Sequence, residues 1–97
     1  MKVMVRSIMT ALPGKMGEAM KLEKKHMAIA NRVLGISPRI YQHLSGGGDT
    51  LRTIITEAEF DSLAAFEDHP KKMGADPEMQ ELAPKLRAVM DRVEVEF

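Results

Sequence analysis

The 97-residue sequence contains no cysteine and no tryptophan, and only 4% of its residues are aromatic. The absence of cysteine excludes disulfides, catalytic thiols and thiolate metal sites. Fourteen basic and fourteen acidic residues cancel to a formal net charge of zero. Because phosphate binding needs clustered lysine and arginine, we expect neither nucleic acid nor an anionic membrane surface as a partner.

Long apolar runs are also missing from the sequence. No segment approaches the roughly 20 apolar residues that would span a bilayer. The first residues, MKVMVRSIM, carry Arg6 within their apolar part, and no cleavage-site pattern follows them. We therefore expect no signal peptide, and predict a cytoplasmic location for a single domain over residues 1–97.

What the sequence does contain is a regular succession of strand-like and helix-like segments. Strands rich in valine, isoleucine and methionine are predicted at 2–10, 39–45, 50–57 and 91–97. The glycine run Gly46-Gly47-Gly48 predicts a hairpin turn between the second and third strands.

Two helical regions complete the pattern. An amphipathic helix is predicted at 15–34, ending at Gly35. A second region begins at Asp61 or Ser62, stops near Pro70 and restarts after a cap at Asp76, with a kink or break at Pro84. The order β-α-β-β-α-β predicts an α+β, ferredoxin-like fold. Its four-stranded antiparallel sheet has the first and third strands at the centre and the helices on one face.

The hairpin register decides which strand residues face the helices. We pair Leu44 with Leu51 and Ile40 with Ile55, because that register gathers aliphatic side chains on one face. The opposite face is then predicted to hold Met4, Arg6, Ile8, Arg39, Tyr41, His43, Arg52, Ile54 and Thr56. This mixed set is typical of a face packed against a partner, which predicts a homodimer through the sheet. Tyr41 is also a candidate for contacting an anion bound there; a network of interface ion pairs is the favoured alternative.

Two ionisable residues, Glu23 and His26, lie on the apolar face of the 15–34 helix, three positions apart. The predicted register places Ser7, Gln42 and Thr53 beneath them. Together these residues would form a polar cluster in an apolar cleft, suited to binding a small organic molecule. Glu23 or His26 would then act as a general acid or base; the alternative is a purely structural hydrogen-bonded pair. Glu23 and His26 also match a di-iron Glu-x-x-His motif, but no second copy exists, so we expect no metal and no cofactor.

The segment TLRTIITEAEFDSLAAFEDHPKKMGADPEMQELAPKL, Thr50 to Leu86, resembles the NIPSNAP-like and antibiotic-biosynthesis-monooxygenase-like families of the dimeric α+β barrel superfamily. The chain length, first strand and long first helix match as well. The resemblance implies two ferredoxin-like protomers packed sheet to sheet. It implies no single activity, since the superfamily includes cofactor-free oxygenases, haem-degrading enzymes, isomerases and cyclases. The sequence lacks the tryptophan often used by quinone-forming relatives. His69 lies roughly where haem-degrading relatives carry a histidine, but its setting, FEDHPKKM, does not match.

Two functions follow as hypotheses. The first is a homodimer that binds a small, partly apolar organic ligand in the cleft between helix and sheet. Such a protein would act as a cofactor-free oxygenase, isomerase or cyclase through proton transfer by Glu23 or His26. The second is a non-catalytic dimerisation or protein-interaction module whose cleft is filled by side chains.

Overall fold

The computed structural model describes residues 1–96, and its elements follow the predicted order. They are β1 (Val3–Ala11), α1 (Met16–Leu34), β2 (Arg39–Gln42), the short 3-10 helix η1 (Thr50–Arg52), β3 (Thr53–Phe60), α2 (Leu63–Gly74), α3 (Pro77–Val89) and β4 (Met90–Glu96). The last position of the predicted final strand, Phe97, lies outside the described residues. Within residues 1–96, no helix is long and apolar enough to cross a membrane.

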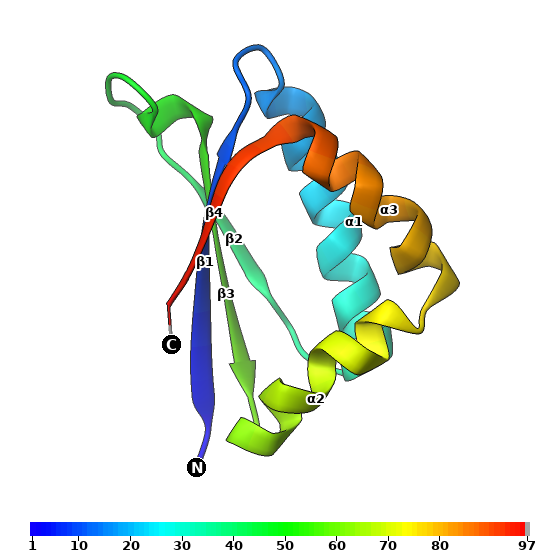
Figure 1. The fold of residues 1–97 in the computed structure, drawn as a ribbon. Coiled ribbons are helices and arrows are strands. Elements are labelled where there is room, and N and C mark those ends of the chain that lie inside the picture. Colours follow the sequence, from blue (N-terminus) through cyan, green and yellow to red (C-terminus); the bar gives the residue numbers. More distant parts are fainter. Residues whose placement is uncertain (97) are drawn as a thin grey trace.

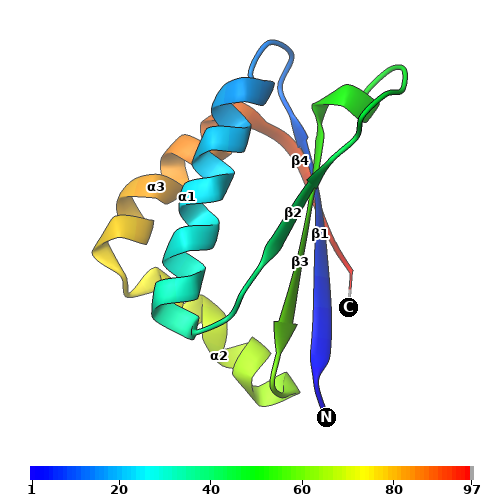
Figure 2. The same ribbon diagram turned by 180° about the vertical axis from the view of Figure 1, so that it is seen from behind.

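The strands form one antiparallel sheet in the order β2-β3-β1-β4, so β1 and β3 are central as predicted. The helices α1, α2 and α3 lie on one side of this sheet (Figures 1 and 2). The other side, which we call the open face, is covered by none of these three helices. The predicted α+β, ferredoxin-like fold is thus confirmed.

The predicted hairpin register is wrong by one residue. Ile40 pairs with Thr56, and Ile55 pairs with Tyr41. β2 ends at Gln42, and a longer connection leads through η1 into β3. Leu44 lies in this connection and is 99% exposed. Because successive strand residues point to opposite faces, the one-residue slip moves Ile54 and Thr56 to the helix side and Thr53 and Ile55 to the open face.

The two helix breaks expected at proline do not occur. α2 runs through Pro70, and α3 runs through Pro84 as one element. The predicted caps are present: the Ser62 side chain accepts a hydrogen bond from the Ala65 N–H, and Gly35 ends α1 with a φ of 68°. Local capping chemistry therefore sets these helix ends, and neither proline ends its helix.

Asp76 caps α3 and forms an ion pair with α1. Its carboxylate accepts hydrogen bonds from the Met79 N–H at 3.0 Å, as the cap of α3, and from Arg32 of α1 at 2.9 Å. The hydrogen bond from Arg32, together with those from the backbone, lowers the pKa of Asp76 below its ordinary value of 3.8. A carboxyl group with a lowered pKa stabilises the fold above its ordinary pKa, and that stabilisation is lost as the pH falls through the lowered value.

We expect Asp76→Ala, which removes both the cap and the ion pair, to lower the melting temperature at neutral pH by about 5 °C. Asp76→Asn keeps a capping side chain and should lower it less. The gap between Asp76→Asn and the wild type should close as the pH falls from neutral to about 2, because the wild-type carboxyl group then becomes neutral. Thermal melts across this pH range measure the difference. If Asp76→Asn and the wild type differ in melting temperature at low pH as much as at neutral pH, the charge of Asp76 has no role in stability.

Candidate functional site

A cavity of about 330 Å³ lies between α1, α2 and the sheet. Its volume is at the lower end of the range for small-molecule sites, about 300–1,000 Å³. Most of its wall is apolar: Val5, Met27, Ala30, Leu34, Ile36, Pro38, Ala58, Phe60, Phe66, Met73 and Val95. The polar lining residues are Ser7, Glu23, His26, Thr56 and His69. An apolar wall with a few polar groups can hold and orient a small, partly apolar molecule.

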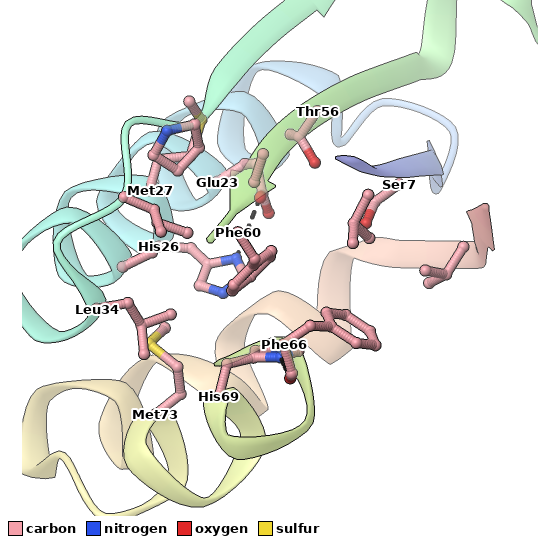
Figure 3. Close-up of a pocket in the computed structure, with 16 residues that line it drawn as sticks. Ser7, Glu23, His26, Met27, Leu34, Thr56, Phe60, Phe66, His69 and Met73 are labelled. Carbon is pink, nitrogen blue, oxygen red and sulfur yellow. Dashed lines mark hydrogen bonds and ion pairs between the residues drawn. The ribbon is translucent and has the colours of Figure 1, made fainter. Parts of the chain in front are cut away.

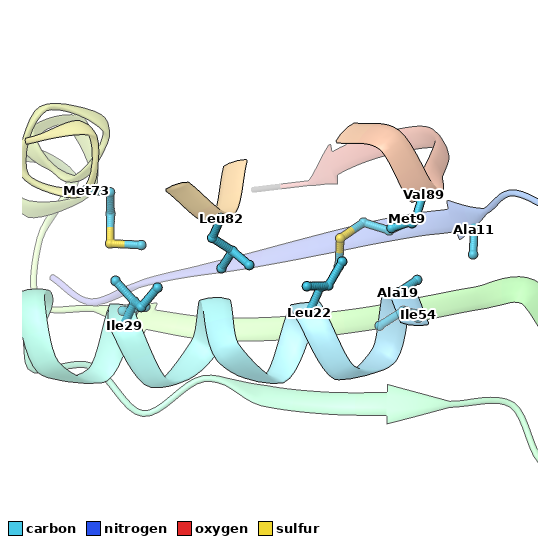
Figure 4. Close-up of a cluster of buried hydrophobic side chains, with 10 residues drawn as sticks. Met9, Ala11, Ala19, Leu22, Ile29, Ile54, Met73, Leu82 and Val89 are labelled. Atoms are coloured by element: carbon cyan, nitrogen blue, oxygen red, sulfur yellow. The ribbon is translucent and has the colours of Figure 1, made fainter. Parts of the chain in front are cut away.

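α1 supplies both the core and the cavity from neighbouring faces. Leu22 and Ile29 point into the cluster of buried side chains between α1, α3 and the sheet (Figure 4). Glu23, His26 and Met27 lie toward the cavity (Figure 3). This arrangement explains why two ionisable residues interrupt the apolar stripe of the sequence: that part of the stripe faces a cavity.

Glu23 and His26 form a hydrogen-bonded pair at the cavity wall. The distance from His26 Nδ1 to Glu23 Oε1 is 3.1 Å. The Glu23 side chain is 4% exposed and the His26 side chain 36% exposed. A carboxylate only accepts hydrogen bonds, so His26 donates through Nδ1, and its Nε2 carries the free lone pair. The arrangement therefore suits His26 to act as a base, with its ring oriented by the Glu23 carboxylate.

Ser7 is the one predicted ligand-binding residue that lines the cavity. It pairs with Thr56 across β1 and β3, and both hydroxyl side chains lie at the cavity (Figure 3). Thr53 was predicted on the helix side opposite Gln42, where the structure has Ile54. Thr53 instead faces the open side, and its hydroxyl donates to the Asp49 carbonyl at 2.9 Å. Gln42 is exposed near the end of β2 and is not among the lining residues.

His69, Phe60 and Phe66 form an aromatic wall that sequence reasoning did not predict. The Phe60 and Phe66 rings meet edge to face at 5.4 Å, and the His69 ring lies 5.3 Å from Phe60 and 5.0 Å from Phe66. The signal was the alternation Ile54, Thr56, Ala58, Phe60, which continues β3 beyond its predicted end at Glu57. Among the described residues, no group of three or more histidine, cysteine, aspartate or glutamate side chains is placed to hold a metal ion.

The open face combines apolar side chains with ion pairs. Met4 and Tyr41 are 50% and 44% exposed, and Ile8 lies opposite Ile55 in the centre of the sheet. Arg6 donates to Glu57 at 2.8 Å, and this hydrogen bond raises the pKa of the guanidinium above its usual range. Tyr41 thus lies on the open face, as predicted, and away from the cavity. Ile54 and Thr56 were also predicted on the open face, but they lie on the helix side.

Solved structures with the same fold are numerous, although no protein-family model matches the sequence and a search of curated proteins finds no match. A NIPSNAP family protein from Agrobacterium tumefaciens superposes with a TM-score of 0.84 at 23% identity, over 98% of this chain and 82% of that one. A NIPSNAP domain protein from Burkholderia xenovorans superposes with a TM-score of 0.76 at 18% identity, over 97% of this chain and 90% of that one. SnoaB from Streptomyces nogalater, a cofactor-independent oxygenase, superposes with a TM-score of 0.71 at 17% identity, over 99% of this chain and 91% of that one.

The structural neighbours are therefore NIPSNAP proteins and proteins of the antibiotic-biosynthesis-monooxygenase-like ferredoxin fold. This confirms the resemblance drawn from the Thr50–Leu86 segment, at the level of the fold. At these identities the likeness carries no residue roles to this chain.

Proposed function

We propose that this protein is a homodimer whose protomers each bind a small, partly apolar organic molecule in the cavity between α1, α2 and the sheet. We further propose that His26, oriented by Glu23, moves a proton to or from that molecule without a cofactor. The observation that carries the proposal is the Glu23–His26 hydrogen bond at the wall of an otherwise apolar cavity.

The chemistry follows from the environment of the pair. Glu23 is buried, so its carboxylate is held in place and keeps the His26 ring in one tautomer. His26 is partly exposed and can exchange protons with solvent between turnovers. Isomerisation, cyclisation and cofactor-free oxidation can each begin with removal of a proton next to an electron-withdrawing group, which is the step this pair would catalyse.

The homodimer rests on the open face. Its central apolar residues, Tyr41, Ile55 and Ile8, lie side by side across β2, β3 and β1, on the side of the sheet that α1, α2 and α3 leave uncovered. The Arg6–Glu57 ion pair borders this patch, and Met4 lies beyond the pair. Apolar patches with a polar rim are typical of protein interfaces. SnoaB shares the fold and is an oxygenase that needs no cofactor, which agrees with the proposed chemistry.

Hydrogen–deuterium exchange of 2-indanone, a neutral bicyclic ketone, tests the proton transfer. In D₂O the His26 Nε2 would take a proton from the carbon next to the carbonyl, and the enolate would recover a deuteron from the exchanged imidazole. We expect the protein to accelerate this exchange, and His26→Ala to lose about 100-fold or more of the acceleration. Proton NMR of the ketone measures the rate.

His43→Ala is the matched control, because His43 is an exposed histidine that does not line the cavity. It should exchange 2-indanone at the wild-type rate. Equal rates for wild type and His26→Ala would contradict the proposed role of His26.

A further inference from the structure

Pro70 and His69 form a local arrangement within α2. In an α-helix the N–H of residue 70 would donate to the carbonyl of residue 66, but proline has no N–H. The Phe66 carbonyl instead accepts a hydrogen bond from His69 Nδ1 at 2.6 Å. The side chain of His69 thus takes the place of the donor that Pro70 lacks.

This hydrogen bond fixes the tautomer of His69. A backbone carbonyl only accepts, so Nδ1 must carry the proton, and the neutral ring keeps its lone pair on Nε2. His26 has the same arrangement, with Nδ1 bound to Glu23 Oε1. Both histidines line the cavity, one from α1 and one from α2 (Figure 3). In each neutral ring, Nε2 is therefore the nitrogen that can accept a hydrogen bond from a ligand.

The charges around the cavity indicate the kind of ligand. None of the described residues that line it is lysine or arginine, and Glu23 contributes a carboxylate. An anionic ligand would meet no lysine or arginine there and would meet one carboxylate. A neutral molecule with hydrogen-bond donors would meet acceptors at both histidines.

We propose that Pro70 fixes the tautomer of His69 through the Phe66 carbonyl, so that His26 and His69 together select a neutral ligand with two hydrogen-bond donors. The assignment of Pro70 as a positioning residue stands on the geometry of α2 alone. The ligand class rests on the proposed function, since it requires that the cavity binds a ligand.

The nitrogen-15 NMR shifts of the His69 ring test the tautomer. At about pH 8.5, where an ordinary histidine is neutral, we expect Nδ1 to show a protonated and Nε2 an unprotonated shift in the wild type. Pro70→Ala restores a backbone N–H to compete for the Phe66 carbonyl, so the Nε2–H form should increase. Pro84→Ala is the matched control, because Pro84 lies inside α3 and does not line the cavity, and it should leave His69 unchanged.

Binding of resorcinol, phenol and benzoate tests the ligand class. Resorcinol has two donors and phenol one, and benzoate is an anion of similar size. We expect the wild type to bind resorcinol more tightly than phenol, and benzoate least. His69→Phe keeps an aromatic ring beside Phe60 and Phe66 but removes the acceptor. It should weaken the binding of resorcinol about tenfold and that of phenol less, because the single donor of phenol still has His26 as an acceptor.

The outcomes separate the two proposals. An Nε2–H tautomer in wild-type His69, which needs no variant to measure, would overturn the role of Pro70, as would an unchanged tautomer in a folded Pro70→Ala. Equal losses for resorcinol and phenol in His69→Phe, or tighter binding of benzoate, would overturn the ligand class while leaving ligand binding intact. If none of the three probes binds the wild type, the ligand class fails, while acceleration of 2-indanone exchange still decides the proposed function and the tautomer result still stands.

Discussion

Replacing Glu23 by methionine should raise the melting temperature of this protein while removing its proton-transfer activity. A carboxylate facing an apolar cavity is poorly solvated, and its one hydrogen bond in the structure is to His26. Methionine has similar length and adapts to irregular apolar surroundings. Because His26 is partly exposed and can be neutral, removing Glu23 leaves no buried charge unpaired. We expect a gain of about 1 kcal/mol, or roughly 5 °C.

The same variant should lower the rate of 2-indanone exchange, because nothing then holds the Nδ1 proton of His26. Glu23→Gln separates the two effects. The amide can either accept from Nδ1 or donate to it, so the ring is no longer held in one tautomer although the packing is nearly unchanged. We expect Glu23→Gln to lose most of the exchange activity, with a smaller change in melting temperature than Glu23→Met.

Glu18→Met is the matched control for stability. Glu18 lies on the same helix, is exposed and pairs with Lys15 at 3.8 Å. Such exposed pairs contribute little, so this variant should stay within about 0.5 kcal/mol of the wild type. A melting temperature for Glu23→Met that falls by the equivalent of about 3 kcal/mol would instead make Glu23 a structural partner of His26.

The fold could be predicted from the sequence because its signals are local and agree with one another. The sequence pattern of each element is visible within the element itself, as in β1 (Val3–Ala11) and α1 (Met16–Leu34). The starts of α2 and α3 are marked by their capping residues, Ser62 and Asp76. The connection rules for β-α-β-β-α-β then leave few topologies. The interruption at Pro70 was predicted from a local rule, and tertiary contacts of α2 overruled it.

The candidate site could be predicted only in part, because strand register is a non-local property. Glu23, His26 and Ser7 depend on the helix period and on the alternation of β1, so they were found. Thr56 was missed and Thr53 wrongly chosen because the register rested on Leu44, which lies in an exposed connection instead of a strand. One residue of slip exchanged the two faces of β3. The hydrogen bond of His69 was beyond any pattern in the sequence, since it depends on a helix continuing past Pro70.

Replacing Ile8 by arginine should dissociate the proposed homodimer. Ile8 lies at the centre of the open face, paired with Ile55 on β3 and with Glu94 on β4. In a monomer an arginine there would reach solvent and lie beside Glu94, so the fold should tolerate it. In a sheet-to-sheet dimer two copies would bring the new charges into one desolvated patch. We expect the dimer dissociation constant, measured by sedimentation equilibrium, to rise about 100-fold or more.

Leu63→Arg likewise replaces an aliphatic side chain by arginine, at an exposed leucine at the start of α2 and away from the open face. It alters the net charge as Ile8→Arg does, so any general effect of added charge on association would appear in both variants. Dissociation by Ile8→Arg alone locates the interface on the open face. A wild type that sediments as a monomer, or a folded Ile8→Arg that remains dimeric, would contradict it. In either case the cavity is unaffected as a binding site, because its lining residues come from the helices and the helix side of the sheet, with Ile36 and Pro38 from the connection between α1 and β2.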